Sequence, residues 1–433
     1  MTAEIAVLNR NAVALAADSA VTLQLPEGPK VYLTNKLFML SKYRPVGVMI
    51  YGAADFMGVP WDTIIKQYRV RLGTRGFPRV QDYADDFLKF IEKQKSFFPE
   101  QRQRRSCDEL TKIWMHRLKA RLQGDVEKAI KTSGPIAEEA VRQKFRQIVK
   151  EDVAHLRKHK PLPRFAKFKV STLLGKYRAV IRKAIKETIQ NLAGAVSMNS
   201  LQRGAALAIL RDLYWYGETG VVIAGFGETE FCPSLCCHKL DSIIAGRLRV
   251  LEDVGKRERI NNIETSAAII PFAQSEMVSL FMNGIDDDCS DFLRAFARKS
   301  FMTGYPDAIS KSLAKYLSGP QKDKVLKQVR RIGNQLSDRL DSIAHGYAKL
   351  MHSDPIIQIV NVLPKQELAA MAEALVNLTS FKRHVARQVE SVGGPIDVAV
   401  ISRGDGFIWV KRKHYFSKEL NPHFLANYFH ERN

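Results

Sequence analysis

One long segment most constrains how this chain can fold. Residues 96–215 have helical periodicity throughout, and strand-like segments lie on both sides of them. The order along the chain is strands, helices, strands, helices, strands, which is typical of an α+β fold. We therefore expect a folded core in two parts, residues 1–95 and 216–433, with residues 96–215 as a basic helical insertion. A further helical stretch is expected at about 285–350.

The positive charge of the chain is concentrated in the same segment. The net charge is +22, and residues 101–215 hold 26 Lys+Arg against 10 Asp+Glu, a net of +16. The densest run, 142–186, includes Phe165, Phe168 and Tyr177 among its basic residues. This pattern predicts binding of a nucleic-acid phosphate backbone or of an acidic protein, and the sequence does not separate the two. No base-reading motif is visible, so contact with nucleic acid would be independent of base sequence.

The composition argues against an integral membrane protein and against a disulfide-rich secreted protein. Of the 433 residues 45% are apolar, enough to bury an ordinary core, but no window holds the roughly 18 uncharged apolar residues of a membrane span. The first residues lack a basic, signal-like segment, and the five cysteines form no disulfide framework. We therefore expect a cytoplasmic protein that does not enter a membrane. Cys236, Cys237 and His238 lack the paired spacing of a zinc site, so we expect buried cysteines in a strand and no cofactor.

Two hairpins are predicted near the start of the chain. Residues 3–8 and 12–17 are apolar runs separated by Asn9-Arg10-Asn11, and residues 36–40 and 46–51 form a second pair that stops at Gly52. Asp18 ends the return strand of the first hairpin, which brings it back beside the chain start.

Thr2 carries a distinctive chemistry if Met1 is removed, as is expected before a small residue. An N-terminal threonine holds a nucleophile and a base together, since the hydroxyl attacks and the α-amine, with a reference pKa of about 8, takes its proton. Lys36 opens the next strand, and its positive charge would lower the pKa of a neighbouring hydroxyl. A backbone N–H at Gly52 could approach a developing oxyanion, because glycine has no side chain.

These residues resemble a known family. Thr2, Val13-Ala14-Leu15-Ala16-Ala17-Asp18-Ser19, Lys36-Leu37 and Gly52-Ala53-Ala54-Asp55 look like the N-terminal signature of proteasome β-type subunits and their bacterial relatives, the N-terminal-nucleophile (Ntn) hydrolases. The resemblance implies a four-layer αββα sandwich, with Thr2 as the nucleophile, Asp18 and Lys36 as a charged pair and Gly52 as the oxyanion donor. Lys30 is the rival lysine, but Lys36 stands at a more family-like distance from Gly52.

The resemblance resumes in later segments and departs from the pattern in two places. Ser391-Val392-Gly393-Gly394 looks like the closing Ser-Gly-Gly turn of the family, but the aspartate expected near Gln388 is missing. The family's other active-site serine would fall near residues 272–275, where Ser275 is a candidate substitute. Ser275 and Ser391 are therefore expected only as supporting residues.

Two functions follow as hypotheses. The first is a threonine-type endopeptidase that hydrolyses peptide bonds, and the resemblance implies assembly into a homo-oligomeric ring and an ATP-driven unfoldase as a partner. Hydrolysis of a small amide would use the same nucleophile. The second is an inactive, proteasome-like scaffold whose basic insertion binds an acidic partner or nucleic acid.

Overall fold

The computed structural model describes residues 3–25, 28–189, 192–211, 215, 217–261, 265–313, 315–316, 319–385, 393–414, 416–417, 419–423 and 426. The chain divides into two compact units. The first unit consists of residues 1–33, 260–400 and 408–433, and the second of residues 34–259 and 401–407. The sheets are antiparallel and the helices lie in separate runs, so the expected α+β class is confirmed.

The first unit is built on one antiparallel sheet and a hairpin. The sheet has the order β13-β1-β2-β14-β15, and β3 pairs with β4 in the hairpin. The strands are β1 Glu4–Asn9, β2 Ala12–Ala17, β3 Ala20–Leu25, β4 Gly28–Leu33, β13 Ala267–Pro271, β14 Asp397–Ser402 and β15 Gly406–Lys411. In the central pair Glu4 lies opposite Ala17, so β2 ends beside the start of β1.

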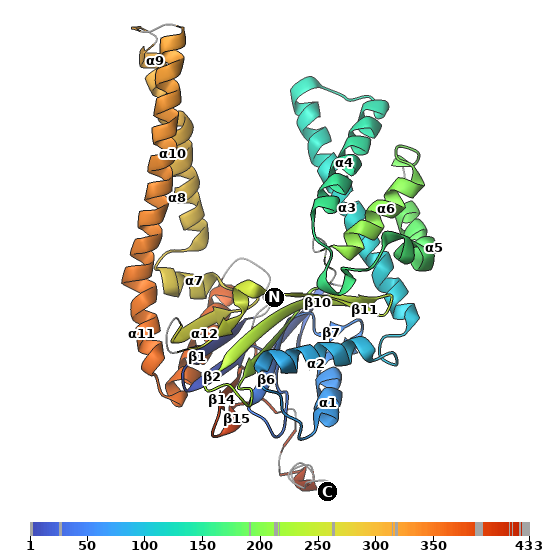
Figure 1. Cartoon of the computed structure of the whole chain (residues 1–433), viewed down its shortest axis with the longest axis vertical. Helices are drawn as coiled ribbons and strands as arrows, with labels where there is room; N and C mark the ends of the chain where they lie inside the picture. Colours follow the sequence, from blue (N-terminus) through green and yellow to red (C-terminus); the bar gives the residue numbers. More distant parts are fainter. Residues whose placement is uncertain are drawn as a thin grey trace. The chain divides into compact units, whose positions relative to one another are not determined.

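Helix α12 (Lys365–Val385) covers one face of this sheet (Figure 1). Alternate strand residues such as Ile5, Val7 and Ala14 pack with Leu368 and Leu375 of the helix. The strand residues between them are buried as well, so both faces of β1 and β2 are removed from water. This explains why these segments are continuous apolar runs and do not alternate with polar residues.

The other helices of the first unit bury much less. They are α7 Glu276–Asn283, α8 Asp287–Lys299, α9 Tyr305–Leu313, α10 Pro320–Ala348 and α11 Asp354–Val362, with π-helical turns at Ser300–Gly304 and Lys349–Ser353. Figure 1 shows α8 alongside the long helix α10. Helix α8 buries no side chain, and the buried residues of α10 are Gly333 and Ser337.

The second unit contains a sheet of order β11-β10-β9-β6-β5, with β12 paired to β10. One face packs on α1 and α2, which supply large buried side chains including Trp61, Tyr68 and Phe87. The elements are β5 Leu37–Met39, β6 Val46–Gly52, α1 Trp61–Leu72, α2 Val80–Lys93, β9 Thr219–Gly225, β10 Ser234–Ile244, β11 Arg247–Glu252 and β12 Glu258–Arg259.

Four helices, connected in the expected basic segment, form a cluster with a core of their own. They are α3 Glu100–Ser133, α4 Glu138–Lys158, α5 Val170–Ile189 and α6 Met198–Leu210. Trp114, Phe145 and Tyr177 are fully buried in this core. Trp114 also donates a hydrogen bond from Nε1 to Asp152 on α4, at 2.7 Å. None of the helices in the described ranges is long and apolar enough to cross a membrane.

A short hairpin separates Gly52 from the first helix of the second unit. Residues 55–60 form a short hairpin, β7 (Asp55–Phe56) and β8 (Val59–Pro60), before α1 begins. Asp55 accepts a hydrogen bond from the Gly58 N–H at 2.7 Å, and Met57 and Gly58 both have positive φ. Asp55 therefore stabilises a tight turn rather than a helix start.

Candidate active site

Asp18 lies beside the start of the chain in the first unit. Its side chain is fully buried, and Oδ1 accepts a hydrogen bond from the Ala3 N–H at 3.0 Å. The Asp18 N–H in turn donates to the Ala3 carbonyl at 3.1 Å. The β1–β2 hairpin thus holds the buried Asp18 carboxylate in hydrogen-bonding contact with Ala3, the residue that follows Thr2. Thr2 itself lies outside the described residues.

Gly393, in the Gly393-Gly394 turn, also forms a hydrogen bond with Asp18. The Gly393 N–H donates to Asp18 Oδ2 at 3.1 Å, so each carboxylate oxygen accepts a backbone donor. The Gly393 carbonyl accepts from the N–H groups of Ser19 and Ala20 at 3.2 and 3.0 Å. Gly394 has φ 77°, and a Cβ there would lie 2.6 Å from Leu33. Ser391, the expected supporting serine of this turn, lies outside the described residues.

Lys36 and Gly52 lie together in the second unit, on the β5–β6 hairpin. Lys36 is buried, and its carbonyl accepts the Ile50 N–H at 2.8 Å, two residues before Gly52. The rival Lys30 is exposed in β4 of the first unit. Gly52 has φ 88°, and a Cβ there would lie 2.3 Å from the Glu218 carbonyl, so this position requires glycine. The structure therefore groups Asp18 with Gly393 in one unit, and Lys36 with Gly52 in the other.

The structure places Ser275 at the first turn of α7, with its side chain exposed and forming no capping hydrogen bond. The segment before it is anchored near the chain start, because the Phe272 N–H donates to the Glu4 carbonyl at 2.8 Å. Ala273 has φ 35°, a conformation that costs a non-glycine residue free energy and is often found at functional sites.

Gln274 is a residue of this region that sequence reasoning missed. It is 5% exposed, and its Oε1 accepts a hydrogen bond from Arg383 Nε on α12 at 3.1 Å. Its Nε2 has no hydrogen-bond partner among the described residues. A buried amide donor of this kind can bind a carbonyl oxygen. A single glutamine in a loop gives no signal in the sequence, because its environment depends on Arg383 more than a hundred residues away.

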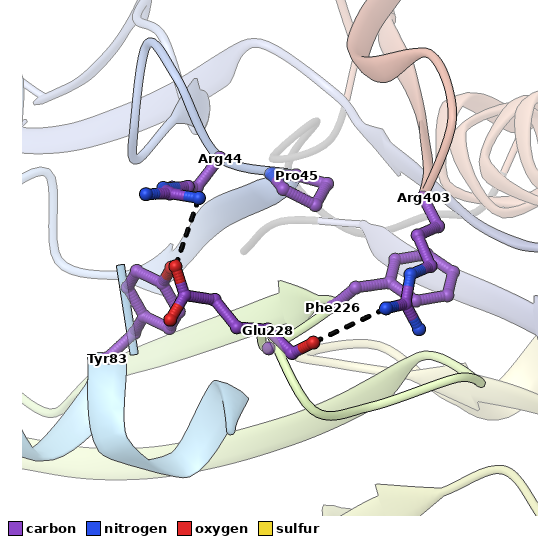
Figure 2. Close-up of a pocket in the computed structure, with 7 residues that line it drawn as sticks. Arg44, Pro45, Tyr83, Phe226, Glu228 and Arg403 are labelled. Atoms are coloured by element: carbon purple, nitrogen blue, oxygen red, sulfur yellow. Dashed lines mark hydrogen bonds and ion pairs between the residues drawn. The ribbon is translucent and has the colours of Figure 1, made fainter. Parts of the chain in front are cut away.

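A cavity of about 300 Å³ lies elsewhere in the second unit, lined by Arg44, Pro45, Tyr83, Phe226, Gly227, Glu228 and Arg403 (Figure 2). Arg44 forms a 3.0 Å ion pair with Glu228, and Arg403 donates to the Glu230 carbonyl at 2.9 Å. The cavity is next to the start of β6, whereas Gly52 ends that strand, about 20 Å away for a strand of this length. Its arginines hold loops together and are separate from the residues discussed above.

The expected buried cysteines are confirmed. Cys236 and Cys237 are both buried in β10. Burial raises the pKa of Cys237 to about 11, with Tyr51 Oη 3.4 Å from its sulfur. This thiol is therefore protonated near neutral pH and a poor nucleophile. Within the described ranges, no three His, Cys, Asp or Glu side chains are grouped to hold a metal ion.

The described residues thus define an α+β protein with a buried carboxylate fixed beside its chain start and a buried lysine on a separate hairpin. Comparison of the sequence with protein-family models and with curated proteins found no match.

Proposed function

We propose that this protein is an N-terminal threonine endopeptidase in which Thr2 is the nucleophile. The observation that carries the proposal is the position of Asp18, which is buried and hydrogen-bonded to the backbone of Ala3 and Gly393. Burying an ionisable carboxylate costs free energy unless it is well hydrogen-bonded, and both oxygens of Asp18 accept backbone N–H groups. Here the carboxylate is hydrogen-bonded to Ala3, which follows Thr2 directly in the sequence.

The proposed reaction has two steps. Thr2 Oγ attacks the amide carbonyl while its α-amine accepts the hydroxyl proton through a water molecule, and that proton passes to the leaving amine as the C–N bond breaks. Water, activated by the same amine, then hydrolyses the ester and restores the hydroxyl. In this proposal Lys36 lowers the pKa of the nucleophile and the Gly52 N–H stabilises the oxyanion. Gln274 Nε2 is a further candidate donor to the substrate.

The four-layer sandwich, the cytoplasmic location, the homo-oligomeric ring and the unfoldase partner belong to the same proposal. Burial of both faces of β1 and β2, and of residues throughout β6 and β9, supports the sandwich, because inner strands of stacked layers are covered on both sides.

The test is the intact mass of the purified protein, with and without an electrophilic probe selective for N-terminal threonine. We expect loss of Met1, a single adduct that is absent in Thr2→Ala, and peptide hydrolysis that Thr2→Ser partly retains. Thr111→Ala is the matched control, since Thr111 is a buried threonine on α3 whose hydroxyl donates to the Cys107 carbonyl. Retained Met1, or an adduct that survives in Thr2→Ala, would contradict the proposal and favour the inactive scaffold.

A further inference from the structure

Helix α5 carries a row of three cations along its exposed side. Arg178, Arg182 and Lys186 are each exposed and are spaced four residues apart. At 1.5 Å per residue, neighbouring members are about 6 Å apart along the helix axis, and the row is about 12 Å long. Each step rotates by only about 40° around the helix, so the three side chains lie on one face.

No described carboxylate forms an ion pair with any of these three side chains, whereas several other cations of the same helical segment are paired. Arg121 pairs with Glu151, Arg142 with Glu138 at 2.8 Å, and Arg146 with Glu139 at 3.2 Å. Like charges at i,i+4 destabilise a helix. The row therefore costs helix stability, and α5 owes its place in the fold to its buried apolar residues rather than to these cations.

The surface around the row is open and free of large apolar groups. Gly175 and Ala179 are exposed on the same face, and a Cβ added at Gly175 would meet no atom within 4 Å. The apolar residues of α5 point the other way, and the buried ones include Leu173, Tyr177 and Ile181. A protein interface usually contains a buried apolar or aromatic centre, and this face of α5 lacks one among the described residues.

We infer that the exposed face of α5 binds the phosphate backbone of nucleic acid, with Arg178, Arg182 and Lys186 each neutralising one phosphate. Regularly spaced cations match a regularly charged polymer, and the small residues between them let the backbone approach. The absence of exposed aromatic side chains on α5 argues against base stacking, so binding is expected to be independent of base sequence. This activity does not depend on the proposed peptidase function.

The test measures the salt dependence of binding to a fluorescently labelled DNA duplex of mixed sequence. The test variant carries Arg178→Gln, Arg182→Gln and Lys186→Gln, which keep good helix formers at exposed positions. The matched control carries Arg121→Gln, Arg142→Gln and Arg146→Gln, which remove the same charge from paired positions. Three phosphate contacts contribute about −2.7 to the slope of log K against log salt, or roughly a 40-fold loss of affinity between about 50 and 200 mM salt.

We expect the test variant to bind the duplex at least tenfold more weakly at low salt. The slope of log K against log salt should become less negative by about two to three. The control variant should change the slope by less than one, and poly-L-glutamate should compete poorly. Equal losses in the two variants would overturn the inference, because the general positive charge would then account for binding. Competition by poly-L-glutamate as effective as by DNA would also overturn it and indicate an acidic protein as the partner.

Discussion

Asp18 is the residue on which the candidate site most depends, because both of its carboxylate oxygens accept backbone hydrogen bonds in a fully buried position. Asp18→Asn keeps the shape but turns an amide NH₂ toward one of the two backbone donors. We expect a loss of about 1–3 kcal/mol in the free energy of unfolding, measured by urea denaturation, and loss of peptidase activity if the proposed function holds.

Asp397→Asn is the control for this prediction. Asp397 is also buried in the first unit, on β14, and accepts a hydrogen bond from the Lys413 N–H at 2.8 Å. We expect a similar loss of stability with activity per folded molecule retained. If Asp18→Asn is as stable as the unchanged protein, the hydrogen bonds to Ala3 and Gly393 do not anchor the chain start.

His238 is expected to make folding stability depend on pH. It is 4% exposed in β10, and burial lowers its pKa, while the charge of Glu252 on β11 opposes the shift. Below the unfolded-state pKa of about 6.5, the unfolded chain binds a proton that the folded chain resists, so this contribution is complete above that pH and decreases as pH falls. Urea unfolding at pH 7.5 and 5.5 should show a larger loss for the unchanged protein than for His238→Gln. An identical loss in both would exclude His238 as the cause.

Site residues that belong to a recognisable sequence pattern could be identified from the sequence. Residues whose environment is created only by the folded structure could not. The hairpin pattern was enough to place Asp18 beside the chain start, and the Ser-Gly-Gly resemblance singled out the turn whose Gly393 meets it. Gln274 and the left-handed Ala273 gave no signal, because their environment is created by the pairing of β13 with β1 and by a distant arginine.

At the scale of elements, helices that both carry many charged residues differ sharply in how much they bury. Ile181 on α5 is fully buried, whereas Leu336 on α10 is 47% exposed. Ile181→Ala is therefore expected to cost about 2–5 kcal/mol, and Leu336→Ala less than about 1 kcal/mol, in the free energy of unfolding measured by urea denaturation. Both variants replace a large aliphatic side chain with alanine, so each serves as the control for the other. Equal losses would mean that α10 is covered by another molecule in solution.

Elements with strong apolar periodicity were predictable, and elements fixed by turns or long-range pairing were not. The two predicted hairpins, of residues 3–17 and of residues 36–51, follow the apolar runs in the sequence. No element was predicted for residues 20–33, where the structure has the β3–β4 hairpin. The strand β13 is short and is defined by its partner β1, from which it is separated by more than 250 residues.

The whole molecule carries a net charge of +22. Repulsion between the excess positive charges destabilises the compact state. Added NaCl screens repulsion between surface charges, since the Debye length falls to about 10 Å at 0.1 M. The ion pairs of the insertion have the opposite response, because screening weakens attraction. With most of the excess charge in residues 101–215, we expect repulsion to dominate, so that the melting temperature at neutral pH rises by roughly 1–4 °C between low and moderate NaCl.

The two triple glutamine variants test this expectation, because they are predicted to change the melting temperature differently. Substituting Arg178, Arg182 and Lys186 with glutamine removes two like-charge i,i+4 pairs, so the variant should melt at a higher temperature in low salt and respond less to NaCl. Substituting Arg121, Arg142 and Arg146 removes the same net charge but breaks three ion pairs, so it should gain less or be destabilised. Differential scanning calorimetry of the three proteins distinguishes these cases. If both variants are stabilised equally, only the total charge matters, and the row on α5 is not a local source of strain.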